Sequence, residues 1–261
     1  MNWFEEKYGP WAVVTGASQG IGAEFCERLA LAGINLVLVA RDSGALDTLA
    51  KKLSTHNIQC RAVALDLSQP EAIALLANQT QGLDIGLLVA SAGLGSIGTL
   101  IDSDLDNECG MVAVNCSAVL AQCHFFGKRF ATQRRGGIIL LSSIVAFQGV
   151  PGSANYAATK AYVQSLAEGL ALELQPFGVD VLAVAPGPVN TGFAKRAGMN
   201  MGKALSAKDI AQASLYALGK RTTTRPGWLS KLLGYSLAML PRWGRTRVLQ
   251  QVMRGMAKAK S

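Results

Sequence analysis

The sequence has few of the residues from which metal sites and disulfide frameworks are built. Its five cysteines include no Cys-x-x-Cys pair, their number is odd, and the only histidines are His56 and His124. Zinc sites and disulfide-stabilised folds both need such residues at close, regular spacing. We therefore expect reduced, mostly buried thiols in a cytoplasmic protein, and we expect no metal site.

The sequence also lacks the patterns of a membrane-spanning helix and of a signal peptide, and its C-terminal part lacks acidic residues. No apolar run reaches the ~20 residues that a membrane-spanning helix needs, and the start of the chain lacks the basic-then-apolar pattern of a signal peptide. No acidic residue follows Asp209, whereas ten basic residues lie from Lys220 onward. The remainder holds fifteen basic and seventeen acidic residues, so the net charge of +8 arises from the C-terminal segment.

A glycine-rich turn follows the first predicted strand, residues 11–15. The turn runs from Gly16 through Gly20 to Gly22, and an amphipathic helix follows it as far as Ala32. Such a turn lets backbone N–H groups approach a pyrophosphate at the helix N-terminus. The spacing is Gly-x-x-x-Gly-x-Gly rather than the commoner Gly-x-Gly-x-x-Gly. We interpret the turn as a nucleotide-binding site.

The end of the second predicted strand, residues 34–39, bears on the choice of nucleotide. An acid at this point would bind the ribose 2′-OH of NAD, whereas an arginine nearby would bind the 2′-phosphate of NADP. Arg41 follows the strand with no acid before it, and Asp42 is a natural N-cap for the next helix. The pattern favours NADP(H) over NAD(H). The alternative is that Arg41 is a solvated charge at a strand end.

Further apolar strands alternate with helices along the chain. They are expected at residues 61–65, 85–89, 138–141 and 179–185. Strands that are apolar throughout and alternate with helices predict a parallel sheet covered on both faces. We predict an α/β fold with a doubly wound, Rossmann-type sheet of about seven strands over residues 1–225. Residues 226–261 would form a basic, partly apolar helical extension of the same domain.

Ligands bind such a sheet at the carboxyl ends of its strands. Ser143 follows the predicted strand at 138–141, and Tyr156 and Lys160 lie four residues apart on the next predicted helix, hence on one face of it. A nearby ammonium favours the phenolate and lowers the tyrosine pKa from its ordinary ~10. A serine hydroxyl could then hold a substrate oxygen. Taken alone, the Tyr–Lys pair would equally suit an ordinary surface helix.

With these residues placed, the sequence resembles the short-chain dehydrogenase/reductase family over roughly residues 10–225. The motifs that carry the resemblance are Thr15-Gly16-x-x-x-Gly20-Ile21-Gly22, Asp66, Ala92-Gly93, Asn115, Ser143, Tyr156-x-x-x-Lys160 and Pro186-Gly187. The thirteen-residue gap between Ser143 and Tyr156 is the one usual in the family, and it selects Ser143 over Ser142.

The resemblance implies roles for four catalytic residues. Tyr156 would be the general acid that protonates a carbonyl oxygen as hydride arrives, and the base in the reverse direction. Lys160 would lower the pKa of Tyr156 and hold the nicotinamide ribose. Ser143 would orient and polarise the carbonyl, and Asn115 would hold a water in a proton relay to Lys160.

The resemblance also implies a cofactor site, in which Asp66 would bind the adenine amino group and Thr191 the carboxamide. The expected cofactor-binding residues are Gly16, Ser18, Gln19, Gly20, Ile21, Gly22, Arg41, Asp66, Leu67, Ala92, Gly93, Tyr156, Lys160, Pro186, Gly187, Val189 and Thr191. One departure from the family is that Ala90-Ser91-Ala92-Gly93 stands where Asn-Asn-Ala-Gly is frequent. Anchoring of this loop must rest on Ser91 or on other groups.

The predicted substrate pocket is mainly apolar, which favours a lipid-like, steroid-like or aromatic carbonyl. Its expected residues are Val145, Phe147, Val150, Pro188 and Phe193. We predict an NADP(H)-dependent oxidoreductase that interconverts a carbonyl and a secondary alcohol, active as a homodimer or homotetramer and without a nucleic-acid partner. The alternatives are a 3-oxoacyl reductase acting on acyl-carrier or membrane-associated lipid substrates, and a catalytically idle NADP-binding regulatory protein.

The C-terminal extension has an apolar part, residues 229–240, followed by a break and a basic helix over residues 246–260. The apolar part is too short to span a bilayer. We predict that it packs on its own subunit or on a neighbour, with Trp228, Leu232, Leu233 and Leu237 turned inward. The alternative is that the basic tail lies on an anionic membrane surface, which would make a cytoplasmic protein membrane-peripheral.

Overall fold

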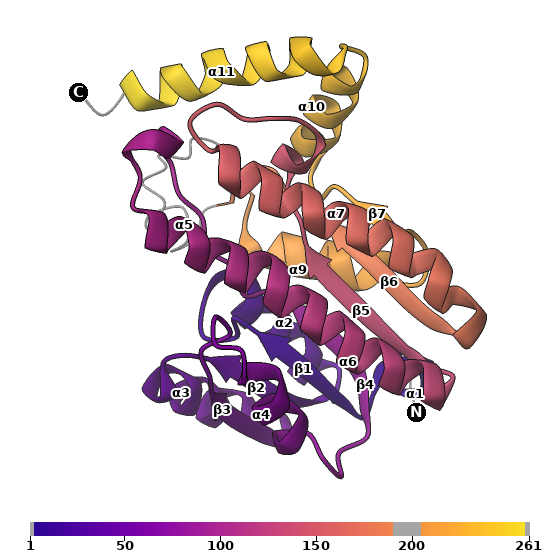
Figure 1. Ribbon diagram of the computed structural model, residues 1–261. Helices are drawn as coiled ribbons and strands as arrows, with labels where there is room; N and C mark the ends of the chain where they lie inside the picture. The colour runs from indigo at the N-terminus through magenta and orange to yellow at the C-terminus, as the bar shows by residue number, and fades with distance from the viewer. Residues whose placement is uncertain (1–2, 190–204, 259–261) are drawn as a thin grey trace.

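The computed structural model describes residues 3–189 and 205–258, and its centre is one parallel seven-stranded sheet (Figure 1). The strand order is β3-β2-β1-β4-β5-β6-β7, and every neighbouring pair is parallel. The strands are β1 (Trp11–Thr15), β2 (Asn35–Ala40), β3 (Cys60–Ala64), β4 (Ile85–Ala90), β5 (Gly136–Leu141), β6 (Val179–Val184) and β7 (Thr223–Thr224). The predicted doubly wound α/β fold is confirmed.

Helices cover both faces of this sheet (Figure 1). One apolar core contains side chains of α2 (Gly20–Leu31), α3 (Ser43–Leu53) and α9 (Ala207–Ala217). The second core contains side chains of α4 (Ala72–Gln79), α6 (Ala118–Gln133) and α7 (Ala154–Leu174). The other α-helices in the described part of the chain are α1 (Trp3–Tyr8), α5 (Leu105–Val112), α10 (Trp228–Ala238) and α11 (Arg242–Lys258). Shorter turns are the 3-10 turns η1 (Ser54–His56), η2 (Leu100–Asp102), η4 (Ile144–Phe147) and η5 (Gln175–Phe177), and the π-helical turn η3 (Ala113–Ser117).

Strands β1, β2, β4, β5 and β6 are almost entirely apolar because each of them has an apolar core on both faces. Val13 belongs to the core beneath α6 and α7, whereas its neighbour Val14 belongs to the core beneath α2 and α9. Every residue of β4 and of β5 is buried. Each fully buried Val or Leu stabilises the fold by roughly 1.5–3 kcal/mol, so these two central strands fix the register of the sheet.

Helices α5 and α6 and the π-helical turn between them form one continuous stretch, Leu105–Gln133. This stretch is long and apolar enough to cross a membrane by length and composition alone. In the structure it packs against β4 and β5 and gives Phe126 and Phe130, both fully buried, to the core. The buried part of its apolar surface is therefore accounted for by packing on the sheet, whereas Leu105, Val112 and Leu120 are exposed.

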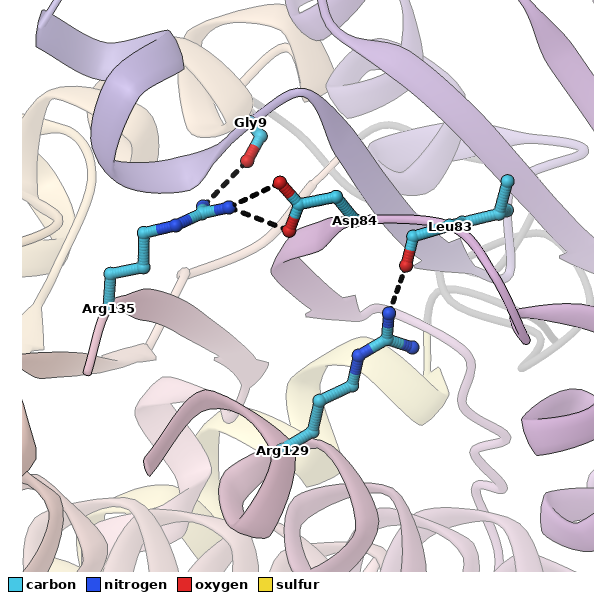
Figure 2. A network of polar contacts seen from close by, with 5 residues as sticks. All are labelled: Gly9, Leu83, Asp84, Arg129 and Arg135. Atoms are coloured by element: carbon cyan, nitrogen blue, oxygen red, sulfur yellow. Dashed lines mark hydrogen bonds and ion pairs between the residues drawn. The ribbon is translucent and has the colours of Figure 1, made fainter. Parts of the chain in front are cut away.

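A network of polar contacts holds the amino end of the sheet together (Figure 2). Arg135, just before β5, contacts both carboxylate oxygens of Asp84 at 2.6 and 2.7 Å and donates to the Gly9 carbonyl at 2.7 Å. Arg129 on α6 donates to the carbonyl of Leu83. These contacts join the segments that precede β1, β4 and β5, so the strands enter the sheet at fixed positions.

The C-terminal extension is helical but is oriented differently from the prediction. Trp228 is 74% exposed and Leu232 is 55% exposed, so the expectation that these two side chains turn inward is wrong. The stripe that faces the body of the protein is formed instead by Ser230, which is buried, and by Gly234 and Leu237, which are partly buried. These residues recur at helical spacing, and Trp228 and Leu232 fall on the other face. The side chain of Leu233 lies outside the described residues.

Candidate active site

Tyr156 and Lys160 lie in the first turns of α7, and both are buried. The Lys160 Nζ is 5.7 Å from the centre of the Tyr156 ring. It donates a hydrogen bond of 2.7 Å to the carbonyl of Leu141, the last residue of β5. A buried pair with a backbone partner at a strand end does not fit an ordinary surface helix. The pair belongs instead to the carboxyl end of the sheet.

Ser143 follows β5 and caps the short helix η4, where its Oγ accepts a hydrogen bond of 3.4 Å from the Val145 N–H. Its side chain also hydrogen-bonds to Tyr156. The neighbouring Ser142 hydroxyl donates instead to the Lys160 carbonyl at 3.2 Å. Of the two serines, Ser143 is therefore the one whose side chain contacts the phenol.

Burial sets the protonation of this pair. It raises the pKa of Tyr156 to about 12, and the hydrogen bond with Ser143 opposes the rise. It lowers the pKa of Lys160 to about 8, against a smaller opposing effect of Cys116. The expectation that Lys160 lowers the tyrosine pKa is wrong for this structure, because desolvation raises it and the opposing effect comes from Ser143. At neutral pH the phenol carries its proton, which is the state that a general acid needs.

Asn115 lies in the π-helical turn between α5 and α6 and is almost fully buried. Its Oδ1 accepts from the Leu94 N–H at 2.8 Å, and its Nδ2 donates to the Leu94 carbonyl at 2.9 Å and to Thr159 Oγ1 at 3.0 Å. A Cβ placed on Gly93 would lie 3.3 Å from Asn115 Oδ1 and 3.5 Å from Lys160 Nζ. Asn115 therefore lies near Lys160, while its amide fixes the loop after β4.

The loop after β4 is anchored by groups other than the missing asparagines. Besides the two hydrogen bonds between Asn115 and Leu94, the Ala92 N–H donates to Thr15 Oγ1 at 3.3 Å. Thr15 is the last residue of β1, so the loop is tied to the neighbouring strand. Ser91 contributes through its backbone, because its N–H donates to the Val89 carbonyl at 3.1 Å.

The glycine-rich turn leaves no room for side chains. A Cβ on Gly22 would lie 2.2 Å from the Gly16 carbonyl oxygen, and a Cβ on Gly16 would lie 2.9 Å from Ala92. Gly16 and Gly20 also have φ of +67° and +60°, a region that favours glycine. Helix α2 begins at Gly20 without a side-chain cap from Gln19. This tight turn at a helix N-terminus fits the phosphates of a dinucleotide.

The two residues expected at the adenosine end lie close enough to interact. Arg41 is exposed directly after β2. Asp66 accepts hydrogen bonds of 2.9 Å from the N–H and from the hydroxyl of Ser68. These bonds from Ser68, with a smaller contribution from Arg41, lower the pKa of Asp66. The Asp66 carboxylate is thus ionised, and Arg41 presents its positive charge beside it.

The other predicted cofactor residues lie along the same edge of the sheet. Ser18 and Ile21 are partly buried in the glycine-rich turn and the start of α2, and Leu67 is buried after β3. After β6, the Pro186 carbonyl accepts from the Ile144 N–H at 3.0 Å, and Val189 bridges to Leu205. Thr191 lies outside the described residues.

The predicted substrate residues are only partly brought together. Phe147 lines a pocket between η4 and the C-terminal helices, whose lining residues are Ile144, Phe147, Gln148, Arg225, Gly234, Leu237 and Arg245. Val145, Val150 and Pro188 are not part of that lining. Val145 is half-buried, Val150 is buried and Pro188 is exposed. Phe193 lies outside the described residues.

A second buried polar cluster was not predicted from the sequence. Glu108 on α5 is 6% exposed, and it accepts from the Ser96 hydroxyl at 2.8 Å and from Asn155 Nδ2 at 2.7 Å. Ser153 Oγ donates to the Ser96 carbonyl at 2.9 Å. The cluster joins the loop after β4 to the residue preceding Tyr156. No local pattern reveals it, because the three segments meet only in the folded chain.

Comparisons with known proteins agree with this geometry. The family profile described as short chain dehydrogenase matches residues 10–201. A 7beta-hydroxysteroid dehydrogenase of Collinsella aerofaciens is 35% identical over 187 residues, which cover 71% of this chain and 71% of that protein. A very-long-chain 3-oxoacyl-CoA reductase of Podospora anserina is 37% identical over 195 residues, which cover 72% of this chain and 57% of that protein.

Two solved structures are similar over nearly the whole chain. One, from a study of 7beta-hydroxysteroid dehydrogenase stereoselectivity, has a TM-score of 0.88 and 29% identity, and covers 94% of this chain and 98% of that one. The other is a short-chain dehydrogenase from Sphingobium yanoikuyae in complex with NADPH. It has a TM-score of 0.79 and 30% identity, and covers 90% of this chain and 97% of that one.

Proposed function

This chain belongs to the short-chain dehydrogenase family, and on that premise we propose that it is an NADP(H)-dependent enzyme that interconverts a bulky, apolar ketone and its secondary alcohol. As an oxidoreductase of this family it acts on a hydroxyl or carbonyl group. The observation that carries the proposal is the buried group of Ser143, Tyr156 and Lys160 at the carboxyl end of β5.

In the direction of reduction, Tyr156 donates its phenolic proton to the carbonyl oxygen, and Ser143 hydrogen-bonds to the same oxygen and polarises the carbonyl. The nicotinamide, when bound, supplies the hydride that the carbonyl carbon accepts, or takes it up in the reverse reaction. The pKa of Tyr156, about 12, favours the proton-donating state at neutral pH. The ammonium of Lys160 stabilises the phenolate that remains after the proton has been transferred.

The glycine-rich turn fits a dinucleotide, because Gly16 and Gly22 allow the tight turn that leads into the N-terminus of α2. Arg41 supports NADP(H) over NAD(H), since its guanidinium is exposed beside Asp66 and could bind a 2′-phosphate. The similarity to a structure described as an NADPH complex supports the same choice.

A steroid-like ketone is the proposed substrate class. The similarity to 7beta-hydroxysteroid dehydrogenases supports a rigid, apolar, multi-ring carbonyl. The second candidate is a 3-oxoacyl reductase, supported by the similarity to a very-long-chain 3-oxoacyl-CoA reductase. A catalytically idle role is less well supported, since Tyr156 and Lys160 are both in place. A homodimer or homotetramer stays a prediction that light scattering can check.

A substrate panel distinguishes these candidates. Purified protein is given NADPH or NADH with ketosteroids, small cyclic ketones and 3-oxoacyl thioesters, and the loss of absorbance of the reduced nucleotide is followed. We expect the highest kcat/KM with NADPH and a ketosteroid. Preference for the 3-oxoacyl thioesters would favour the second candidate. Bound NADPH without turnover of any carbonyl, or of the matching alcohols with NADP, would contradict both enzymatic proposals.

A further inference from the structure

The C-terminal helices present large apolar side chains to solvent. Met239 is 90% exposed, Trp228 is 74% exposed and Trp243 is 66% exposed, and Leu232 and Leu240 are each more than a third exposed. Single exposed apolar residues are ordinary, but a group of large ones on one element marks an interaction surface. This group lies on α10, on the turn after it and at the start of α11.

Basic side chains are interspersed with this apolar group. Lys231, Arg242 and Arg247 are exposed, and the Arg247 guanidinium is 5.3 Å from the centre of the Trp243 ring. The sequence has no acid after Asp209 to neutralise them. We call the following residues the tail surface: Trp228, Lys231, Leu232, Met239, Leu240, Arg242, Trp243 and Arg247.

The tail surface faces away from the body of the protein. Figure 1 shows α11, in yellow, crossing the top of the view outside the helices that cover the sheet. Among the residues whose side chains the structure describes, neither α10 nor α11 has an extended packing contact with another element. The inner face of α10 is attached locally, because the Gly187 N–H donates to Ser230 Oγ at 3.1 Å. In the segment before α10, the Arg225 guanidinium lies 4.3 Å from the Phe147 ring centre.

The positive charge of this surface decides which of two partners covers it, a second copy of the chain or a lipid bilayer. Two copies meeting through their tail surfaces would bring Lys231, Arg242 and Arg247 of each against the same charges of the other, with no acid in either tail. An anionic lipid surface has the opposite charge, and its headgroup region is where tryptophan side chains prefer to lie. Met239 and Leu240 at the turn have the length to reach the apolar region below the headgroups.

We propose that the tail surface docks this protein on anionic lipid bilayers. The apolar side chains of α10 and of the α10–α11 turn insert at the level of the headgroups, and the basic residues pair with lipid phosphates. The protein rests on the bilayer and does not cross it. Docking is independent of the proposed activity, since none of these residues lies among Ser143, Asn115, Tyr156 and Lys160.

Vesicle flotation of the full-length protein tests the docking. Vesicles of phosphatidylcholine alone are compared with vesicles that also contain phosphatidylglycerol. We expect the protein to float with the anionic vesicles and not with the neutral ones. Added salt should weaken the binding only in part, because salt screens the charge contribution but not the insertion of apolar side chains.

Two double variants separate the apolar and the basic contributions. Met239→Ser with Trp243→Ser removes apolar surface, and Arg242→Gln with Arg247→Gln removes charge. Each should weaken binding to anionic vesicles at least tenfold. The matched controls are Leu31→Ser with Leu75→Ser, two exposed leucines on α2 and α4, and Lys51→Gln with Lys128→Gln, two exposed lysines on α3 and α6. The controls should bind like the wild type, and all variants should keep the wild-type unfolding temperature.

Four outcomes would overturn the proposal. The first is no flotation of the wild type with anionic vesicles at low salt. The second is equal weakening by the control variants, which would show a diffuse charge effect. The third is self-association that Met239→Ser with Trp243→Ser abolishes, without vesicle binding, since this would identify the occupant as a second copy. Binding to single-stranded RNA but not to vesicles would likewise replace lipid with nucleic acid.

Discussion

The two ends of the sheet use buried and half-buried polar groups in opposite ways. At the amino end, Tyr8 donates to Asp180 at 2.5 Å, and burial together with this carboxylate raises the pKa of the tyrosine. At the carboxyl end, Tyr156 is also buried but hydrogen-bonds to the neutral Ser143. A carboxylate holds the first phenol as a fixed donor. The second phenol has a partner from which its proton can be redirected to a substrate.

The ion pairs follow the same division. Arg135 with Asp84, and Lys7 with Asp180, join the segments at the amino end of the sheet. At the carboxyl end, the Lys160 ammonium donates to the Leu141 carbonyl, so the charge is held by a backbone oxygen and not by an acid. The difference shows that the polar groups at the amino end hold the strands in position. At the carboxyl end, no acid in the described part of the chain neutralises the Lys160 ammonium, so its charge is available for catalysis.

The largest effect is expected when each of the two tyrosines is replaced, one at a time, by phenylalanine. Tyr156→Phe should keep the fold and nucleotide binding but lower kcat ~10²–10⁴-fold, because the ring still packs and the transferable proton is lost. Tyr8→Phe is the matched control. It should lower the free energy of unfolding by about 1 kcal/mol and leave kcat unchanged. Near-normal kcat in Tyr156→Phe would rule out its role as the proton donor.

The next test concerns the charge at the adenosine end of the same edge. Arg41→Ala should weaken NADPH binding about ten- to a hundredfold, the range expected for losing charge-assisted hydrogen bonds to a phosphate. NADH lacks the 2′-phosphate, so its affinity should stay the same. Lys51→Ala, on the exposed face of α3, is the control, and titration of protein fluorescence gives both affinities. Equal weakening for the two nucleotides would assign Arg41 a structural role.

The pH profile of ketone reduction tests the buried lysine. Lys160 titrates at about 8, below its ordinary range, so its ammonium is present at neutral pH and is lost as the pH rises through that value. Tyr156, at about 12, stays protonated over the same interval. We expect kcat/KM for reduction to fall above pH 8 and to approach a tenfold loss per pH unit. A flat profile between about pH 7 and pH 10 would mean that the lysine charge is not needed.

The smallest effect on catalysis is expected at the amino end. Arg129→Met removes the hydrogen bonds to the carbonyls of Leu83 and Thr80 and should lower the free energy of unfolding by ~1–3 kcal/mol. Thermal unfolding would show a drop of about 2–4 °C for each kcal/mol in a chain of this size. The control Lys128→Met changes an exposed neighbour. A large loss of kcat at unchanged substrate affinity would contradict the division between the two ends.

The sequence predicts the sheet well because the strands are apolar, buried and separated by clear turns. It predicts six of the strands to within two residues, but not the position of β7, whose two residues, Thr223 and Thr224, are polar. The glycine turn and the Tyr156–Lys160 pair are also local patterns. The contacts of Glu108 are not, because they join segments that are distant along the chain.

Two other features show the limits of a sequence pattern. The π-helical turn at Asn115 inserts an extra residue into a continuous helical pattern, and a buried π turn is stabilised by its tertiary contacts. The orientation of α10 depends on Ser230, a small polar residue that occupies the inner face by hydrogen-bonding to Gly187. Hydrophobicity alone places Trp228 and Leu232 inside, and for that reason the prediction for these two residues is wrong.

The buried carboxylate of Glu108 has a consequence for redesign of the enzyme. Through Ser96 it holds the loop after β4, and through Asn155 it holds the residue beside Tyr156. Grafting the corresponding loop from another enzyme would leave this carboxylate without one of its two donors, and the resulting shift would reach the proton donor. A loop exchange in this scaffold therefore has to transfer the residues at positions 96 and 108 together.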